Sequence, residues 1–155
     1  MLDKINRFER KWVYRSFDHL TLVNALIRSN LFFNKQHPNR RVNSIYFDDA
    51  NYSSIIENLD GVSKKKKIRI RWYGEQDKLL NPILEIKSKK GFETKKESYE
   101  INELNGLKFN DIKNFEKIKN IVNLKMLTKK IIFPILTTNY DRYYLVSNNH
   151  SVRAT

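Results

Sequence analysis

The stretch from Lys67 to Tyr73 alternates between cationic and apolar side chains, and it constrains the fold of this chain most strongly. Alternation with period two is typical of a β-strand that is buried on one face. Such a strand separates two sets of side chains: Lys67, Arg69 and Arg71 on one face, and Ile68, Ile70 and Trp72 on the other. Cations that share a face repel one another unless an anion lies across them. We therefore expect a sheet in which further strands add to a cationic face.

The overall charge also indicates an anionic partner. The chain has 155 residues, with 30 Lys and Arg against 17 Asp and Glu, and its net charge is +13. A chain of this length suits one domain with a buried core. The positive excess favours nucleic acid, a phosphorylated small molecule, polyphosphate or an anionic membrane surface as partner, and charge alone does not choose among them.

Several kinds of site are excluded by composition. The chain has no cysteine, so it has neither disulfides nor a Cys-based zinc site. Its four glycines form no phosphate-binding glycine-rich loop, so any phosphate must be bound by side chains. No apolar run approaches the roughly 20 residues that a membrane span needs, and the N-terminus has no signal-peptide core. We expect a cytoplasmic location.

Strands and helices follow from the same patterning. Strands are predicted at residues 7–14, 41–49, 82–89, 93–101 and 135–147 and from residue 152, with helices at 20–30, 51–59 and 102–131, the last broken near Asn120. Residues 34–39 are predicted to form a loop. The run Lys64–Lys67 is interpreted as a solvated edge. In the strand at 93–101 either Lys95 or Lys96 could face inward.

Charged residues recur at same-face positions on successive strands, and this indicates a lumen. In a closed or nearly closed antiparallel barrel the inward positions line the interior. A lumen with this many cations is stable only if it is wet and holds phosphate oxygens, which Arg binds bidentately and Lys attracts as a point charge. The cations at these positions are Lys11, Arg69, Arg71, Lys87, Arg142 and Arg153. Glu9 and Glu85 lie among them and could hold a divalent metal that bridges phosphates.

At this point the motifs resemble a known family. Arg7–Trp12 resembles the opening R-x-E-x-K-aromatic strand of the VTC (vacuolar transporter chaperone) polyphosphate polymerase domain, in the CYTH/triphosphate tunnel superfamily. Ile68–Tyr73 resembles the family's R-x-R-W/Y-Y strand, and Leu84–Lys87 its E-x-K strand. The order of the remaining matches makes the set specific: Ser44–Asp48, Thr94–Lys96, Tyr140–Arg142 and Val152–Thr155.

The resemblance implies an α+β fold with an incomplete antiparallel β tunnel or barrel and helices packed outside. It implies an enzyme that transfers the γ-phosphate of ATP to a growing polyphosphate chain with Mn²⁺ or Mg²⁺, releasing ADP. The implied catalytic residues are Lys11, Arg69, Arg71 and Lys87, the implied phosphate-binding residues are Arg7, Lys96, Arg142 and Arg153, and the implied metal ligands are Glu9 and Glu85. It also favours Lys96 over Lys95 as the inward residue.

The family's domain continues past the strand that Val152–Thr155 begins. We therefore expect residues 1–155 to be the N-terminal two-thirds of a single domain, with the last strands missing. The expected partners are ATP and polyphosphate rather than DNA. A partner subunit at the cytoplasmic face of a membrane is compatible with the resemblance.

Two other classes of function stay open. A nucleic-acid-binding module could use basic strands interleaved with aromatics that stack on bases, namely Trp72, Tyr73, Tyr143 and Tyr144. Against it, the aromatics alternate away from the cations on the central strand. Within the superfamily, the alternatives are a triphosphatase or cyclase, or a non-catalytic domain that binds polyphosphate.

Overall fold

The structure is a computed structural model that describes residues 9–15, 18–109, 111–126 and 131–155. The chain divides into two compact units, residues 1–37 with 144–155 and residues 38–143. Each unit is described by itself. In the described residues no helix is long and apolar enough to cross a membrane.

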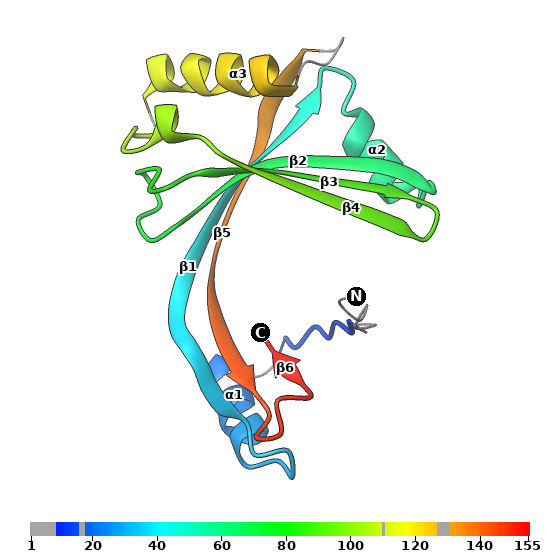
Figure 1. Ribbon diagram of the computed structural model, residues 1–155, viewed down its shortest axis with the longest axis vertical. Helices are drawn as coiled ribbons and strands as arrows, with labels where there is room; N and C mark the ends of the chain where they lie inside the picture. The colour runs from blue at the N-terminus through cyan, green and yellow to red at the C-terminus, as the bar shows by residue number, and fades with distance from the viewer. Residues whose placement is uncertain (1–8, 16–17, 110, 127–130) are drawn as a thin grey trace, which may run out of the picture. The chain divides into compact units, whose positions relative to one another are not determined.

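Six strands form one sheet in the hydrogen-bonded order β4-β3-β2-β1-β5-β6 (Figure 1). The pairs β1–β2, β2–β3, β3–β4 and β5–β6 are antiparallel. The strands are β1 Asn34–Asp49, β2 Lys64–Tyr73, β3 Ile83–Lys90, β4 Glu93–Glu100, β5 Ile132–Val146 and β6 Arg153–Ala154. The predicted α+β class with an antiparallel sheet is confirmed.

The helices are α1 His19–Ile27, α2 Ser53–Leu59, the short 3-10 helix η1 Asn102–Leu104, and α3 Ile112–Met126. The N-cap of α1 is Asp18, whose carboxylate accepts a hydrogen bond from the Thr21 amide at 2.9 Å. At the end of β1, the buried carboxylates of Asp48 and Asp49 accept from backbone amides of residues 51–55. These two acids therefore cap α2 and are structural.

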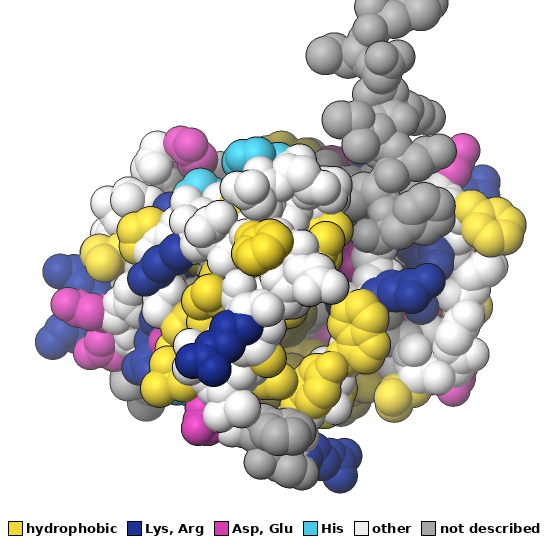
Figure 2. Space-filling model, turned by 90° about the horizontal axis from the view of Figure 1, so that it is seen from below, with side chains coloured by type: hydrophobic (Ala, Val, Ile, Leu, Met, Phe, Trp, Pro, Cys, Tyr) yellow, Lys and Arg dark blue, Asp and Glu magenta, His cyan; other side chains and the backbone are white. Residues whose placement is uncertain are grey.

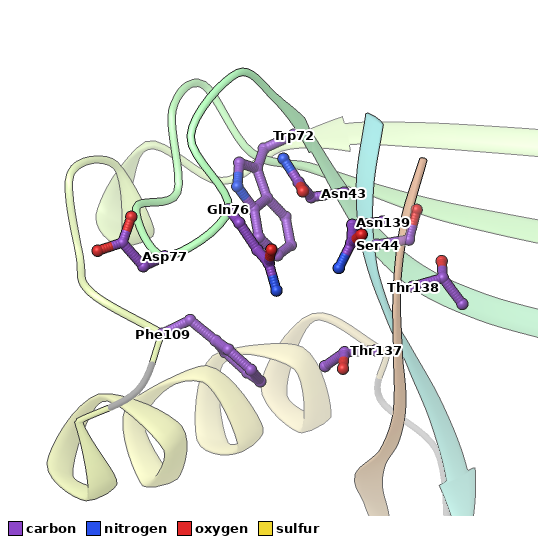
Figure 3. A pocket seen from close by; sticks show the side chains of 9 residues that line it. All are labelled: Asn43, Ser44, Trp72, Gln76, Asp77, Phe109, Thr137, Thr138 and Asn139. Atoms are coloured by element: carbon purple, nitrogen blue, oxygen red, sulfur yellow. The ribbon is translucent and has the colours of Figure 1, made fainter. Parts of the chain in front are cut away.

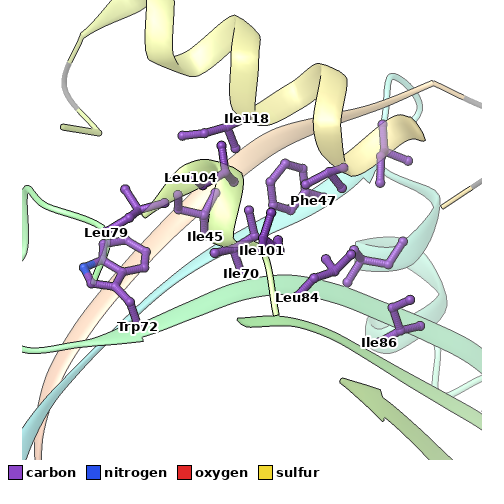
Figure 4. Packing of buried hydrophobic residues seen from close by; sticks show 13 residues of the cluster. Ile45, Phe47, Ile70, Trp72, Leu79, Leu84, Ile86, Ile101, Leu104 and Ile118 are labelled. Atoms are coloured by element: carbon purple, nitrogen blue, oxygen red, sulfur yellow. The ribbon is translucent and has the colours of Figure 1, made fainter. Parts of the chain in front are cut away.

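The core of the second unit lies on one face of β1, β2 and β3. Strand register aligns Ile45 with Ile70 and Ile70 with Leu84, and all three are fully buried. Helix α3 covers this face through Ile118 and Val122 (Figure 4). The alternation of β2 thus places its apolar set under α3 and its cationic set on the opposite face.

The hairpin between β3 and β4 fixes the position of β4. Lys90 pairs with Glu93, so the turn has two residues, and the first of them, Gly91, has φ of 59°. Glycine reaches positive φ at no steric cost, which suits it to the first position of a two-residue hairpin turn. This short turn sets which residues of β4 share a face with Glu85.

Three local predictions were wrong. Residues 9–15 form neither strand nor helix, because alternation alone does not supply a strand with hydrogen-bonding neighbours. Residues 34–39 belong to β1 and are not a loop; Pro38 is exposed there, where a missing amide costs little. Helix α3 runs unbroken through the exposed Asn120, because Ile118 and Val122 on either side are anchored in the core.

Candidate functional site

The face of β2, β3 and β4 opposite the core carries five of the ten predicted site residues. Register aligns Lys67 with Lys87 and Lys87 with Lys96, and it aligns Arg69 with Glu85. We call this surface the cationic face. It consists of seven cations, Lys65, Lys67, Arg69, Arg71, Lys87, Lys89 and Lys96, with two carboxylates, Glu85 and Glu100.

Glu85 is the centre of the cationic face. Its side chain is 8% exposed, and three cations lie against it. Oε2 accepts from Nε and Nη2 of Arg69, each at 2.7 Å. Oε1 accepts from Nζ of Lys96 at 2.7 Å and has a longer contact of 3.5 Å with Nη1 of Arg71. One buried carboxylate therefore faces three positive charges.

Tyr46 on β1 holds the other end of Arg69. Nη1 of Arg69 donates to the phenol oxygen of Tyr46 at 3.0 Å, and the guanidinium lies 5.8 Å from the centre of the ring. Arg69 is thus fixed between the neighbouring strands β1 and β3. A guanidinium held at both ends loses little rotamer freedom when it binds an anion.

The pKa values of Glu85 and Arg69 are shifted by burial and by their hydrogen-bond partners together. Burial alone would raise the pKa of Glu85, but the hydrogen bonds and charges of Lys96 and Arg69 outweigh burial, and the pKa is lowered. Burial alone would lower the pKa of Arg69, but its bonds to Tyr46 and Glu85 raise it. Both groups are therefore charged at neutral pH.

Arg71 is the least satisfied cation of the cationic face. Its side chain is 11% exposed, and its Nε is buried with no hydrogen-bond partner in the structure. Its cross-strand neighbour Ser44 likewise has a buried hydroxyl without a partner. A buried donor without an acceptor is unfavourable, so a small movement that brings an anion to this guanidinium is favoured.

The cations exceed what the carboxylates can neutralise. Lys67, Lys87 and Lys96 stand directly opposite one another on three neighbouring strands, an arrangement of like charges that is unfavourable without a counter-anion. Arginine and lysine side chains are also the groups that bind phosphate oxygens most strongly. The cationic face is therefore suited to an anion that carries several negative charges.

The structure brings five of the predicted site residues together: Arg69, Arg71, Glu85, Lys87 and Lys96. The phase of β4 is settled, because Lys96 pairs with Glu85 while Lys95 points to the other face and pairs with Glu97 at 3.0 Å. Lys96 therefore lies on the same face of the sheet as Glu85. The roles given to these residues stay predictions.

The other predicted residues lie in the first unit, on β5 or outside the described residues. Glu9 and Lys11 are exposed and pair with each other at 3.5 Å in the first unit, which also contains Arg153. Arg142 on β5 donates to Tyr140 of its own strand at 3.1 Å. Arg7 lies outside the described residues.

The metal ligands predicted from the sequence do not form a metal site in the described residues. No group of three His, Cys, Asp or Glu side chains gathers among the residues that the structure describes. Both oxygens of Glu85 already accept from cations, and four contacts fill the acceptor sites of a carboxylate. This donor set does not fit Mn²⁺ or Mg²⁺, and we derive no step through a metal.

Sequence reasoning missed three residues of this surface. Lys65 and Lys89 share the cationic face, and Tyr46 holds Arg69 from β1. The period-two pattern, extended back from Lys67, would have found Lys65. The tyrosine needed the register of β1 against β2.

Trp72 does not have the role that the nucleic-acid alternative gives it. Its ring is 2% exposed, its Nε1 donates to the backbone oxygen of Glu75 at 2.8 Å, and it lies beside Phe109 in the core. A buried ring cannot stack on a base, so this part of the alternative is wrong.

A separate hollow lies at the end of the core between β1, β5 and the loop after β2 (Figure 3). Its volume is about 380 Å³, and the side chains that line it include Asn43, Gln76, Asp77 and Phe109. No lysine or arginine is among the described residues of its lining. On the face seen from below, exposed Lys and Arg side chains are scattered among apolar side chains (Figure 2).

A family model for the VTC domain matches residues 6–155. A comparison with curated proteins finds no match to the chain. Because the family match spans nearly the whole chain, the chain belongs to the VTC domain family, as the motifs predicted. VTC domains are associated with polyphosphate synthesis, and the family includes polyphosphate polymerases.

Proposed function

We propose that this VTC domain binds the phosphates of ATP and polyphosphate on its cationic face and transfers the γ-phosphate of ATP to the end of a polyphosphate chain. The observation that carries the proposal is the excess of seven cations over two carboxylates on one face of three neighbouring strands. Membership of the family supports polyphosphate rather than another polyanion.

In the proposed reaction a terminal oxygen of the polyphosphate chain attacks the γ-phosphorus of ATP. A new P–O bond forms, the bond from that phosphorus to the β–γ bridging oxygen breaks, and ADP leaves with the electron pair. Such a step needs positioning and charge neutralisation more than covalent help from the protein. We assign charge neutralisation to Arg69, Arg71 and Lys87, and binding of neighbouring phosphates to Lys96.

Residues of the first unit and of β5 complete the proposal. For Lys11 we propose the catalytic role that the family resemblance implies, and for Arg7, Arg142 and Arg153 the phosphate-binding role that it implies. A divalent ion, Mn²⁺ or Mg²⁺, is proposed to enter with the nucleotide, because triphosphate oxygens supply most of its ligands in many such sites. Its charge would offset that of the triphosphate.

The test is calorimetric titration with long-chain polyphosphate, a non-hydrolysable ATP analogue and single-stranded RNA. Arg71→Ala should weaken polyphosphate binding about tenfold, the loss expected for one charge-assisted contact. Lys66→Ala is the matched control, because Lys66 lies on β2 but on the opposite face. Equal losses in both variants, or tighter binding of RNA than of polyphosphate, would contradict the proposal.

A further inference from the structure

Glu85 has an environment that neither a metal ligand nor an ordinary surface ion pair would have. It lies on β3, with Arg69 and Arg71 on β2 on one side and Lys96 on β4 on the other. Four nitrogen atoms from these three cations contact its two oxygens. The carboxylate therefore occupies the place, within the cationic face, that an anionic ligand would occupy.

The cations differ in how tightly Glu85 holds them. Arg69 is bound by Glu85 at one end and Tyr46 at the other, so it is fixed in both directions. In the described part of the chain Lys96 pairs with Glu85 alone and its side chain is 54% exposed, so its ammonium can turn away. Among the same residues Arg71 has the 3.5 Å contact with Glu85 and an Nε without a partner.

A carboxylate and a phosphate oxygen are bound by the same donors in the same geometry. A phosphate near Glu85 therefore competes for Lys96 and Arg71 while Arg69 stays in place. The negative charge of Glu85 also opposes the approach of a polyanion. In the free protein, in contrast, it prevents the three cations from repelling one another and moving apart.

We propose that Glu85 is a positioning residue: an internal counter-anion that holds Arg69, Arg71 and Lys96 in place and yields Lys96 and Arg71 to incoming phosphate oxygens. This inference rests on the proposed function, because it names how the phosphate-binding face is kept assembled. It assigns Glu85 a different role from the metal-binding role that the sequence motif implied.

The experiment is a titration of Glu85→Gln with tripolyphosphate in buffer freed of divalent metals. The amide keeps the shape of the side chain but removes its charge. We expect the variant to bind tripolyphosphate about threefold more tightly than the wild type at low salt, because one screened repulsion is gone. We also expect tripolyphosphate to raise the Tm of the variant more than that of the wild type.

Two further variants make the comparison specific. Glu97→Gln is the matched control: Glu97 lies on the opposite face of β4, paired with Lys95, so the same change in net charge there should alter the affinity much less. Glu85→Asp keeps the charge and should return the affinity toward the wild-type value.

The outcomes separate this inference from the proposed function. If the wild type binds tripolyphosphate and Glu85→Gln binds it equally or more weakly, the inference fails and the proposed function stands. If Glu85→Gln binds a nucleotide more weakly than the wild type only when Mn²⁺ is present, Glu85 is a metal ligand and the inference fails. If the wild type binds no tripolyphosphate at all, both proposals fail.

If Glu85→Gln does not fold, NMR spectroscopy of the wild-type protein tests the inference instead. In NMR spectra the Nε–H resonance of Arg71 and the Nζ resonance of Lys96 should shift saturably when tripolyphosphate is added. Arg41, which pairs with Asp141 at 3.2 Å, is the control and should shift less. Unchanged resonances of Arg71 and Lys96 in a protein that binds tripolyphosphate would overturn the inference.

Discussion

At the scale of single residues, the side chain that decides the behaviour of the site is an acid. In the proposed site lysine and arginine attract phosphate, and Glu85 is the only carboxylate in direct contact with Arg69, Arg71 and Lys96 among the described residues. Removing one partner of a buried ion pair leaves the other without compensation, which is costly. Single substitutions here therefore change stability and binding together.

The titration of Glu85 should be visible in the stability of the protein. Despite burial, Lys96 and Arg69 lower the pKa of Glu85 below its usual value. A group with a lowered pKa in the folded state contributes stability above its unfolded pKa, and this contribution is lost as the pH falls through the folded value. We expect the difference in Tm between the wild type and Glu85→Gln to shrink as the pH is lowered from 6 to about 3, below the usual range of a glutamate.

Thermal unfolding at a series of pH values measures this difference. Glu100→Gln is the control, because Glu100 is an exposed carboxylate on the same face of β4. Parallel Tm curves for the wild type and Glu85→Gln would mean that Glu85 contributes no stability through its charge.

Neighbouring lysines on β2 offer a second prediction at this scale. Lys67 lies on the cationic face opposite Lys87, whereas Lys66 lies on the other face opposite Ser88. Lys67→Ala should weaken polyphosphate binding about threefold at low salt, a loss typical of an exposed charge pair, and Lys66→Ala should weaken it less. Calorimetry at two salt concentrations measures both. A larger loss from Lys66→Ala than from Lys67→Ala would mean that polyphosphate binds the opposite face of the sheet, which contradicts the prediction.

At the scale of elements, the stability of the second unit depends on hydrogen bonds that join helix α3 to the sheet. Asn123 of α3 forms a two-way bridge to β5: its Nδ2 donates to the backbone oxygen of Ile132, and its Oδ1 accepts from the amide of Ile132, each at 2.8 Å. An amide side chain thus pairs with the first residue of β5 as a neighbouring strand would. This contact connects the layer of α3 to the strand that carries Arg142.

Asn123→Ala should destabilise the second unit. The change removes the side-chain partner of both the amide and the carbonyl of the buried Ile132, and each buried group left unsatisfied costs about 1–3 kcal/mol. Chemical denaturation measures the free energy of unfolding. Asn120→Ala on the exposed side of the same helix is the control and should be neutral or slightly stabilising, because alanine favours helix. Equal stability of the two variants would show that the bridge contributes little.

The sequence patterns of single strands predicted one part of the site, and the pairing of the strands determines the rest. The alternation in β2 predicted which of its side chains share the cationic face. The E-x-K pattern predicted that Glu85 and Lys87 share one face of their strand, and strand register puts both on the cationic face. The contact between Lys96 and Glu85 was not readable from either strand alone, because it depends on the two-residue turn at Gly91. Register is a property of pairs of strands, and turn chemistry sets it.

At the scale of the whole molecule, the family and the fold class were predicted from ordered motifs, and both are confirmed. The strand at residues 7–14 was predicted from the same alternation and is absent from the described residues 9–15. An alternating segment becomes a strand only if another strand satisfies its backbone hydrogen bonds. The relation of Lys11 and Glu9 to the cationic face therefore could not follow from the pattern of their own segment.

The net charge of +13 gives a last prediction at this scale. So large an excess attracts any polyanion at long range, but this general attraction is screened when the Debye length falls to about 3 Å at 1 M salt. Partly buried cations such as Arg69 and Arg71 are screened less than exposed lysines, and in the proposed complex they contact phosphates directly. Raising the salt should therefore weaken single-stranded RNA binding more than polyphosphate binding. Calorimetric titrations at about 0.1 M and 0.5 M salt measure the ratio of the two affinities, which should increase in favour of polyphosphate. A ratio that stays constant would mean that the chain binds polyanions by net charge alone and that the arrangement around Glu85 adds no selectivity.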